Sequence, residues 1–403
     1  MPVNRQWVMA SRPSPDVREE NFRLVESPVP EPAEGQFVVR TLYLSVAPVM
    51  RMYMLDGAGI EAPLQVGDVM RGRGVGRIVA SRQPGWRVGE IVQGKLGWQE
   101  YSVADGSPYY MMYKVEQRLV PFSTALGVLG MTGFTAYLGL TEIGRVQAGE
   151  TVLVSGAAGG VGSNCGFVAR NLSCRVVGIA GTDEKCRLLV EKLGYDAAIN
   201  YRSDDVPARI AEHCPGGIDV FFDNVGGELL DHALARLNRY GRVVLCGRIS
   251  QYLVAPEDAY RLRNWHMVGK QRARMEAFFI YDLERHFPAA ERQRAEWIAG
   301  GRARGPRADA ACADAPLRRQ QRRQAGRARR RLIQAAPSSR PGDAAGSPAN
   351  SGSQRASAAA RPRSATVRTD AGTSRAPDPA RNASRRSRSD RASREIQISC
   401  VPT

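Results

Sequence analysis

The sequence predicts an α/β protein of two domains, the second built on a doubly wound parallel sheet, followed by a disordered basic tail. Three observations lead to this prediction. Residues 1–300 are rich in Val, Leu, Gly and Tyr and have the length of about two domains. Short apolar runs alternate with amphipathic stretches between residues 150 and 247, as in consecutive βαβ units. Residues 301–403 contain no Phe, Tyr, Trp or Met, so they cannot bury enough apolar surface to fold.

The positive charge of the chain lies almost entirely in the tail. Residues 301–403 hold 23 of the 57 basic residues, all of them Arg, and 7 of the 40 acidic residues. Residues 1–300 therefore contain 34 basic and 33 acidic groups and are nearly neutral. Such a tail would bind the phosphates of nucleic acid without sequence preference, because it has no aromatic rings to stack on bases. Nucleic-acid binding through the tail is thus one functional hypothesis, and we expect no specific nucleic-acid partner.

Several absences restrict the cellular context. No apolar run of about 18 residues occurs, so we expect no membrane-spanning helix and no membrane partner. The N-terminal residues lack the apolar stretch of a signal peptide. The 7 Cys residues are scattered without a C-x-x-C pair, as expected of reduced thiols, and we predict a cytoplasmic protein.

The elements of the parallel sheet are expected in alternating order. A β-branched run at 151–155 predicts a buried strand, and the amphipathic stretch that ends at Leu172 predicts the helix after it. Further strands are expected at 175–181, 196–201, 218–227 and 242–247, with helices at 183–194, 206–213 and 228–238 between them.

The turn between the first strand and the first helix predicts a dinucleotide site. It reads Ala157-x-Gly159-x-x-Gly162, the usual G-x-G-x-x-G with Ala at its first position. Gly159 lets the backbone approach a pyrophosphate, and Gly162 lets the helix pack on the strand. The amides at the helix N-terminus then face the phosphates. The alternative interpretation is a tight turn that binds nothing.

The residues after the second strand favour NADPH as the cofactor. The strand ends at the small residue Gly181, and Lys185 is close enough to reach a 2′-phosphate, while Tyr201 could line the adenosine pocket. Two alternatives stay open: Lys185 as a solvated surface residue, and NAD bound through Asp183. No metal site is expected, because residues 1–164 contain neither Cys nor His to bind a catalytic zinc ion.

The chain resembles the zinc-independent medium-chain dehydrogenases/reductases, the family of prostaglandin reductase (leukotriene B4 dehydrogenase), 2-alkenal double-bond reductases and curcumin-reductase-like proteins. The resemblance covers about residues 4–300 in order. It implies a GroES-like β-rich substrate domain at 1–127, a Rossmann NADP-binding domain at 128–290 and a return toward the substrate domain at 291–300. The segments that carry it include "NRQWVMASRP", "VGDVMRGRGVGRIVAS", "LGMTGFTAYLGL", "SGAAGGVGS", "AGTDEKCRLLVEKLGYDAAINY", "FDNVGGELLD", "CGRISQY" and "RARMEAFFIYD".

The resemblance also implies an activity. The family reduces a C=C bond conjugated to a carbonyl with NADPH, an oxidoreductase reaction on CH–CH groups (EC 1.3.1 type). The partner would be an α,β-unsaturated aldehyde or ketone, and a quinone reductase of the same superfamily is the alternative. Family members tend to be homodimers, whereas the altered C-terminus leaves the oligomeric state open. The implied cofactor contacts are Gly159, Gly160, Val161, Gly162, Ser163, Lys185, Tyr201, Asn224, Cys246, Gly247, Ile249, Ser250, Tyr252, Phe278, Phe279 and Ile280.

Tyr252 is the implied catalytic residue. Its hydroxyl would donate a hydrogen bond to the substrate carbonyl, where negative charge builds as hydride adds to the β-carbon. The alternative is a packing aromatic in a loop. One departure affects the site, because Val49 stands where the family often has a Tyr that faces the substrate. Tyr53 is close in sequence, but the sequence does not show that it substitutes.

Beyond Gly301 the chain departs from the resemblance. An acidic-apolar segment and an ending of the form G-x-N-x-G-K-x-V-V-R are expected, and an Arg-rich segment stands there instead. GC-rich codons chosen for Leu317–Ala328 encode Phe-Gly-Gly-Ser-Asn-Gly-Gly-Lys-Leu-Val-Val-Arg when read one nucleotide further on. We therefore expect residues 301–403 to be out of frame, with a destabilised or impaired reductase as the consequence.

Overall fold

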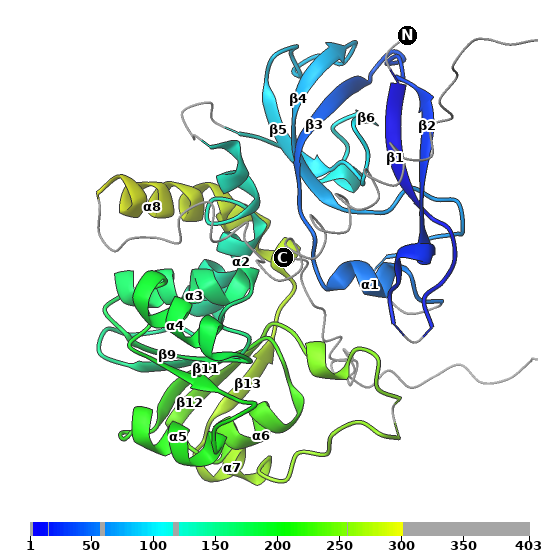
Figure 1. Ribbon diagram of the computed structural model, residues 1–403. Coiled ribbons are helices and arrows are strands. Elements are labelled where there is room, and N and C mark those ends of the chain that lie inside the picture. The colour runs from blue at the N-terminus through cyan, green and yellow to red at the C-terminus, as the bar shows by residue number, and fades with distance from the viewer. Residues whose placement is uncertain (1–2, 15, 57–60, 116–120, 256, 301–403) are drawn as a thin grey trace, which may run out of the picture. The chain divides into compact units, whose positions relative to one another are not determined.

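The computed structural model describes residues 3–14, 16–56, 61–115, 121–255 and 257–300, all of which fall in one unit of the chain (Figure 1). These residues form a two-stranded ribbon, a five-stranded sheet and a six-stranded sheet. The tail, residues 301–403, lies outside the described residues, so its expected disorder and altered reading frame stay predictions.

The first half of the chain is built from antiparallel strands. β1 (Val3–Met9) pairs with β2 (Phe22–Pro28), and the five-stranded sheet has the order β6-β3-β4-β5-β7. Phe37, Val39 and Ile78 lie on one face of this sheet and are fully buried in a common core. The other elements are β3 (Phe37–Leu44), α1 (Val49–Tyr53), β4 (Arg73–Ser81), β5 (Ile91–Lys95), β6 (Tyr101–Ala104), β7 (Tyr113–Lys114), η1 (Glu19–Asn21), η2 (Pro108–Tyr110) and η3 (Phe122–Leu126).

The second half contains the predicted doubly wound sheet. Every neighbouring pair of strands is parallel, and the order is β10-β9-β8-β11-β12-β13, which is that of a Rossmann domain. The fold class predicted from the sequence is therefore confirmed. The strands are β8 (Thr151–Val154), β9 (Arg175–Ala180), β10 (Ala197–Asn200), β11 (Ile218–Asp223), β12 (Leu237–Leu245) and β13 (Arg274–Ala277). The helices between them are α3 (Gly160–Asn171), α4 (Asp183–Lys192), α5 (Val206–His213), α6 (Gly227–Leu234) and α7 (His266–Lys270), with the short turn η5 (Ile249–Gln251).

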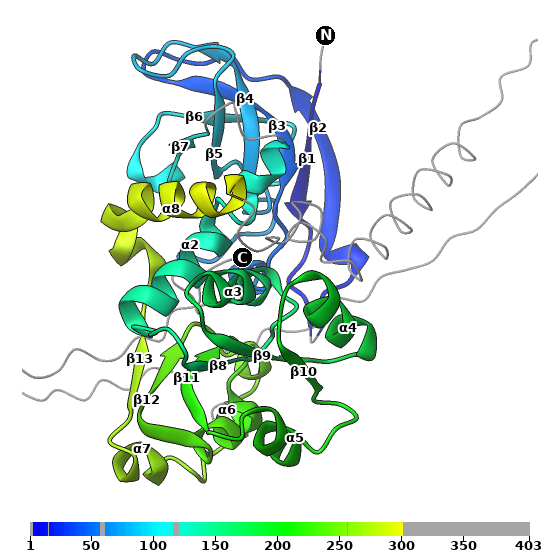
Figure 2. The same ribbon diagram turned by 90° about the vertical axis from the view of Figure 1, so that its left-hand side faces the viewer.

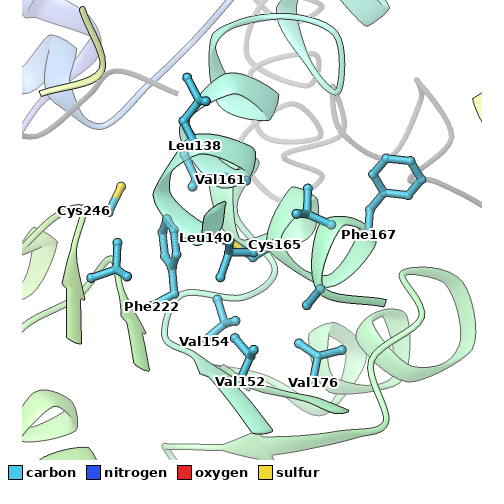
Figure 3. Packing of buried hydrophobic residues seen from close by; sticks show 14 of the residues in the cluster. Leu138, Leu140, Val152, Val154, Val161, Cys165, Phe167, Val176, Phe222 and Cys246 are labelled. Carbon is cyan, nitrogen blue, oxygen red and sulfur yellow. The ribbon is translucent and has the colours of Figure 1, made fainter. Parts of the chain in front are cut away.

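Helices cover both faces of the parallel sheet, because successive side chains of a strand point to opposite sides. Val152 and Val154 pack with α3 in one apolar cluster, whereas Leu153 between them packs with α5 and α6 in another. Figure 1 shows α3 and α4 on one side of the sheet and α5, α6 and α7 on the other. Figure 3 shows the cluster on the α3 side, where Cys165 and Val161 of this helix meet Val154 and Phe222 of the strands.

Three elements differ from the sequence prediction. The strand expected at 218–227 ends at Asp223, because the chain turns there and α6 begins at Gly227. The helix expected at 228–238 ends at Leu234, because the chain turns and Leu237 already pairs with Ile218 as the start of β12. β13 was not predicted as a strand. It lies at the sheet edge, and its four side chains are all only half-buried, so the apolar run that marks a central parallel strand is absent.

After β13 the chain returns through η6 (Ile280–His286) to α8 (Phe287–Ala299), which packs on α2 (Met131–Leu138). The rings of Phe134 and Phe287 stack with centroids 4.2 Å apart. α2 continues into a single π-helical turn, η4 (Gly139–Ile143), and also packs on α3. Figure 2 shows α8, α2 and α3 in succession. α8 therefore packs on α2, and α2 packs in turn on α3, the helix that follows the glycine turn.

Candidate functional site

The carboxyl ends of the parallel strands all lie at one edge of the six-stranded sheet. β8, β11, β12 and β13 end there at Val154, Asp223, Leu245 and Ala277. In doubly wound sheets ligands bind beyond this edge, at the point where the strand order reverses. In this sheet that point lies between β8 and β11, because β9 and β10 are added on one side of β8 and β11, β12 and β13 on the other. The glycine turn after β8 stands at this position.

The glycine turn is too tight for larger residues at two positions. Gly156 has a φ of +58°, a conformation that favours glycine. A Cβ on Gly162 would lie 2.4 Å from the Gly156 carbonyl oxygen and 2.6 Å from the Ala157 Cα. The first turn of α3 is thus pressed against the loop, which is the packing role predicted for Gly162.

The N-terminus of α3 can bind an anion. Gly159 is the N-cap residue, and the first turn contains no acidic side chain that would repel a phosphate. The amides of Gly160, Val161 and Gly162 have no acceptor within the helix, because they belong to its first turn. Ser163 differs from these residues, since its amide donates to the Gly159 carbonyl and its hydroxyl to the Gly160 carbonyl. Its side chain is buried, so the backbone of this turn is the part that faces a ligand.

Asp223, the last residue of β11, is hydrogen-bonded to the residue that follows β8. Its carboxylate has no exposed surface and accepts hydrogen bonds from the Ser155 hydroxyl (2.7 Å) and from the amides of Val225 and Gly226 (both 3.0 Å). Burial raises the pKa of this carboxyl group, and the hydrogen bonds oppose the rise. Asn224 is fixed in turn, because its side-chain amide donates to the Ser155 carbonyl at 2.7 Å. Sequence reasoning selected Asn224 and missed Asp223 and Ser155, which meet across 68 positions of the chain.

The segment after β12 packs over the loop after β11. The amide of Ser250 donates to the Val225 carbonyl at 3.1 Å, and its hydroxyl donates to the same oxygen at 2.7 Å. Ile249 is 44% exposed, whereas Cys246 and Gly247 are buried, so contacts with a ligand from the latter two would come through the backbone. Tyr252 ends this turn and is half-buried.

The three residues that follow β13 differ in burial. Phe278 and Ile280 are buried in the apolar cluster around α2 and α3, and Phe278 lies against Gly139. Phe279 lies between them in sequence, is half-buried, and contacts the edge of the Tyr281 ring with centroids 4.9 Å apart. Phe279 is therefore the only one of these three side chains that is not fully buried, although it also packs against the apolar cluster.

The residues predicted to bind a 2′-phosphate lie just after β9 and β10 in the chain. A Cβ on Gly181 would lie 2.9 Å from the Tyr201 ring, so the small residue makes room for this tyrosine. Lys185 stands half-buried in the first turn of α4, and its amide donates to the hydroxyl of the N-cap residue Thr182 at 3.2 Å. In the part of the chain that the structure describes, no carboxylate forms an ion pair with the Lys185 ammonium group. Gly181 and Tyr201 therefore lie close together, and the binding of a 2′-phosphate by Lys185 and Tyr201 stays a prediction.

Two neighbours refine the choice of cofactor. Asp183, the residue on which the NAD alternative depends, accepts a hydrogen bond from the Asn200 side chain at 2.7 Å. Arg202 lies beside Tyr201, with its guanidinium carbon 5.7 Å from the ring centroid, and is exposed. Sequence reasoning did not select Arg202, although it directly follows Tyr201. Two cations, Lys185 and Arg202, therefore stand just after β9 and β10, and the Asp183 carboxylate is hydrogen-bonded within the fold.

Within the described ranges, no group of three or more His, Cys, Asp or Glu side chains is arranged to hold a metal ion. The helices in those ranges are all too short or too polar to span a bilayer.

Two protein-family models match the chain. Residues 5–112 match the model described as the N-terminal domain of oxidoreductase, and residues 160–295 match the model described as zinc-binding dehydrogenase.

Similar proteins are known from bacteria and plants. The NADPH-dependent curcumin reductase of Escherichia coli K12 is 40% identical over 299 residues, which cover 73% of this chain and 86% of the relative. The NADP(+)-dependent 2-alkenal reductase of Nicotiana tabacum is 40% identical over 263 residues, covering 64% and 75% of the two chains. The crystal structure of CurA from Vibrio vulnificus in complex with NADPH is 37% identical. It covers 74% of this chain and 89% of that chain, with a TM-score of 0.69.

Proposed function

We propose that this chain, which belongs to the zinc-independent medium-chain dehydrogenase/reductase family, uses NADPH to reduce a C=C bond conjugated to a carbonyl. The substrate class is the α,β-unsaturated aldehydes and ketones. Relatives with about 40% identity are named for curcumin and 2-alkenal reduction, which supports this class. The observation that carries the proposal is the N-terminus of α3 at the carboxyl edge of the sheet, together with Lys185 beyond β9, whose ammonium group has no carboxylate partner among the described residues.

The residues of the site fit a phosphorylated dinucleotide. The pyrophosphate would lie against the first-turn amides of α3, which carry the positive end of the helix dipole. The 2′-phosphate would lie between Lys185 and Tyr201, with Arg202 within reach. Asn224, Ser250 and Phe279 would border the ribose and nicotinamide, because they stand on the loops after β11, β12 and β13.

The chain then has to stabilise charge on the substrate. NADPH, when bound, supplies the hydride that adds to the β-carbon. Negative charge develops on the carbonyl oxygen, and the hydroxyl of Tyr252, at the end of η5, would donate a hydrogen bond there. A donor of this kind lowers the barrier by about 2–4 kcal/mol in a site that excludes water. The α-carbon finally takes a proton from solvent.

Stopped-flow oxidation of NADPH with 2-alkenals and with benzoquinones tests the activity. We expect turnover of the alkenals. Reduction of benzoquinones alone would make the protein a quinone reductase, and oxidation of NADPH by neither class would refute the proposed activity.

A separate binding experiment tests the assignment of the cofactor. Lys185→Ala should weaken NADPH binding by roughly 10-fold or more and leave NADH binding unchanged, because the lost ion pair involves only the 2′-phosphate. Lys192→Ala, at the other end of α4, is the matched control and should bind NADPH as the wild type does. A wild-type preference for NADH that Lys185→Ala does not alter would contradict the assignment.

A further inference from the structure

Arg73 is a buried cation outside the site described above. It is the first residue of β4, a strand inside the five-stranded sheet, and only 6% of its surface is exposed. Charged side chains are almost never buried to this extent unless an opposite charge accompanies them.

All hydrogen-bond partners of Arg73 in the described chain are neutral. Nη2 donates to the Gln93 side-chain oxygen at 3.2 Å and to the Met111 carbonyl at 3.0 Å. Nη1 donates to the Tyr281 hydroxyl at 3.4 Å, and Nε has no hydrogen-bond partner. Within the described residues no carboxylate lies within 4.0 Å of the guanidinium group, so its positive charge is not neutralised locally.

Tyr281 connects this charge to the candidate site. It stands four residues after the end of β13, whose carboxyl end lies beside that of β12. Its ring contacts Phe279, a half-buried residue on the loop after β13. The Tyr281 oxygen accepts a hydrogen bond from Arg73, so its own proton remains to be donated. No described residue accepts that proton.

We propose that Tyr281, polarised by Arg73, is a second hydrogen-bond donor to the oxygen on which negative charge develops. This inference rests on the proposed function for the identity of that oxygen, the carbonyl of the unsaturated substrate. Tyr281 is a catalytic residue in this scheme, and Arg73 is a positioning residue that acts through it.

The surroundings of the pair strengthen this interaction. Tyr113 lies under the guanidinium group, with its ring centroid 5.8 Å from the guanidinium carbon. Burial raises the pKa of Tyr113 to about 12, which indicates a poorly hydrated environment. In such an environment a chain of hydrogen bonds that starts at a cation is stronger than in water, and each bond polarises the next. The Arg73 charge therefore makes the Tyr281 proton a better donor to an oxyanion.

A stable oxyanion can test this without turnover. 4-Nitrophenol would be titrated into the full-length protein with NADP⁺ at fixed pH, and its bound phenolate and neutral forms would be distinguished by absorbance. The wild type should bind the phenolate more tightly than the phenol. Tyr281→Phe and Arg73→Met should each lower phenolate affinity by roughly 10-fold, with little effect on the neutral form. Arg73→Lys should restore part of the lost affinity, because it keeps the charge.

The surface offers a matched control. The Tyr240 hydroxyl also accepts a hydrogen bond from an arginine, Arg272, at 3.1 Å, but Tyr240 is 55% exposed. Tyr240→Phe should leave phenolate binding unchanged. Equal phenolate affinity in wild type and Tyr281→Phe, or a wild type that does not favour the phenolate, would overturn the proposal.

Kinetics separate this proposal from the proposed function. With a 2-alkenal substrate, Tyr281→Phe should lower kcat on the order of 10²-fold, with a smaller change in KM and unchanged NADPH affinity. If the wild type reduces alkenals and Tyr281→Phe keeps the full kcat, the proposal is refuted and the proposed function stands. If no alkenal is reduced but phenolate binding depends on Tyr281, the proposed function is refuted and the oxyanion site remains.

Discussion

Replacing Arg294 with Met should stabilise the protein. Arg294 lies on α8 with no exposed surface, and its two terminal nitrogens have no hydrogen-bond partner among the described residues. Its Nε donates to the Ala290 carbonyl at 3.0 Å, and its guanidinium carbon lies 4.3 Å from the centroid of the Phe134 ring. A buried cation with no carboxylate within 4.0 Å among the described residues opposes folding, and Met fills a similar volume without charge.

The magnitude follows from the energy of burying this charge. Burial lowers the pKa of Arg294 to about 9, so the group is still charged at neutral pH. Compared with an exposed guanidinium, whose pKa is several units higher, the charge is disfavoured by about 5 kcal/mol. Loss of the Phe134 ring contact and of the hydrogen bond to Ala290 offsets about 2–3 kcal/mol of this. Arg294→Met should therefore raise the free energy of unfolding by about 2–3 kcal/mol and Tm by roughly 5–10 °C.

Urea unfolding followed by tryptophan fluorescence measures this change. Arg292→Met, on the exposed face of α8, is the control and should change stability by less than about 0.5 kcal/mol. Above about pH 9 the folded protein releases the Arg294 proton while the unfolded chain keeps it, so this group stabilises the fold as pH rises. The gap between wild type and variant should therefore be constant near neutral pH and narrow above pH 9. A variant less stable than the wild type would refute the reasoning.

Three further predictions concern the nucleotide edge and the tail. Gly162→Ala should abolish NADPH binding measured by fluorescence titration, because its Cβ would lie 2.4 Å from the Gly156 carbonyl oxygen. Gly269→Ala, where a Cβ meets nothing within 4 Å, should bind NADPH as the wild type does. Asp223→Ala should lower the free energy of unfolding in urea by about 3 kcal/mol, because it leaves the Ser155 hydroxyl and two buried amides without their acceptor. An unchanged urea midpoint would argue against that role. Deletion of residues 301–403, which removes 23 Arg residues and 7 acidic residues, should abolish retention on nucleic acid at low salt while NADPH affinity is kept. Loss of NADPH binding on deletion would show that the tail serves the reductase.

The sequence predicted those features that depend on residues close together in the chain. The strand–turn–helix order, the glycine turn at Gly159 and Gly162, and the position of Lys185 shortly after the second strand are all of this kind. Each arises from side-chain periodicity or from the conformational freedom of single residues, and both can be read from a short window. β13 was not predicted as a strand, because an edge strand does not need an apolar run.

What only the tertiary structure decided is which distant residues meet. Arg73 and Tyr281 are separated by 208 positions, and Ser155 and Asp223 by 68, so no local pattern connects them. The burial of Arg294 likewise depends on how α8 lies on α2, since nothing in its neighbourhood on the helix marks it as different from the exposed Arg292. The sequence by itself determined the parallel sheet and the glycine turn, because local backbone preference and apolar periodicity specify them. Packing decided where the uncompensated charges lie, because the energy of a buried charge depends on all the groups around it in space.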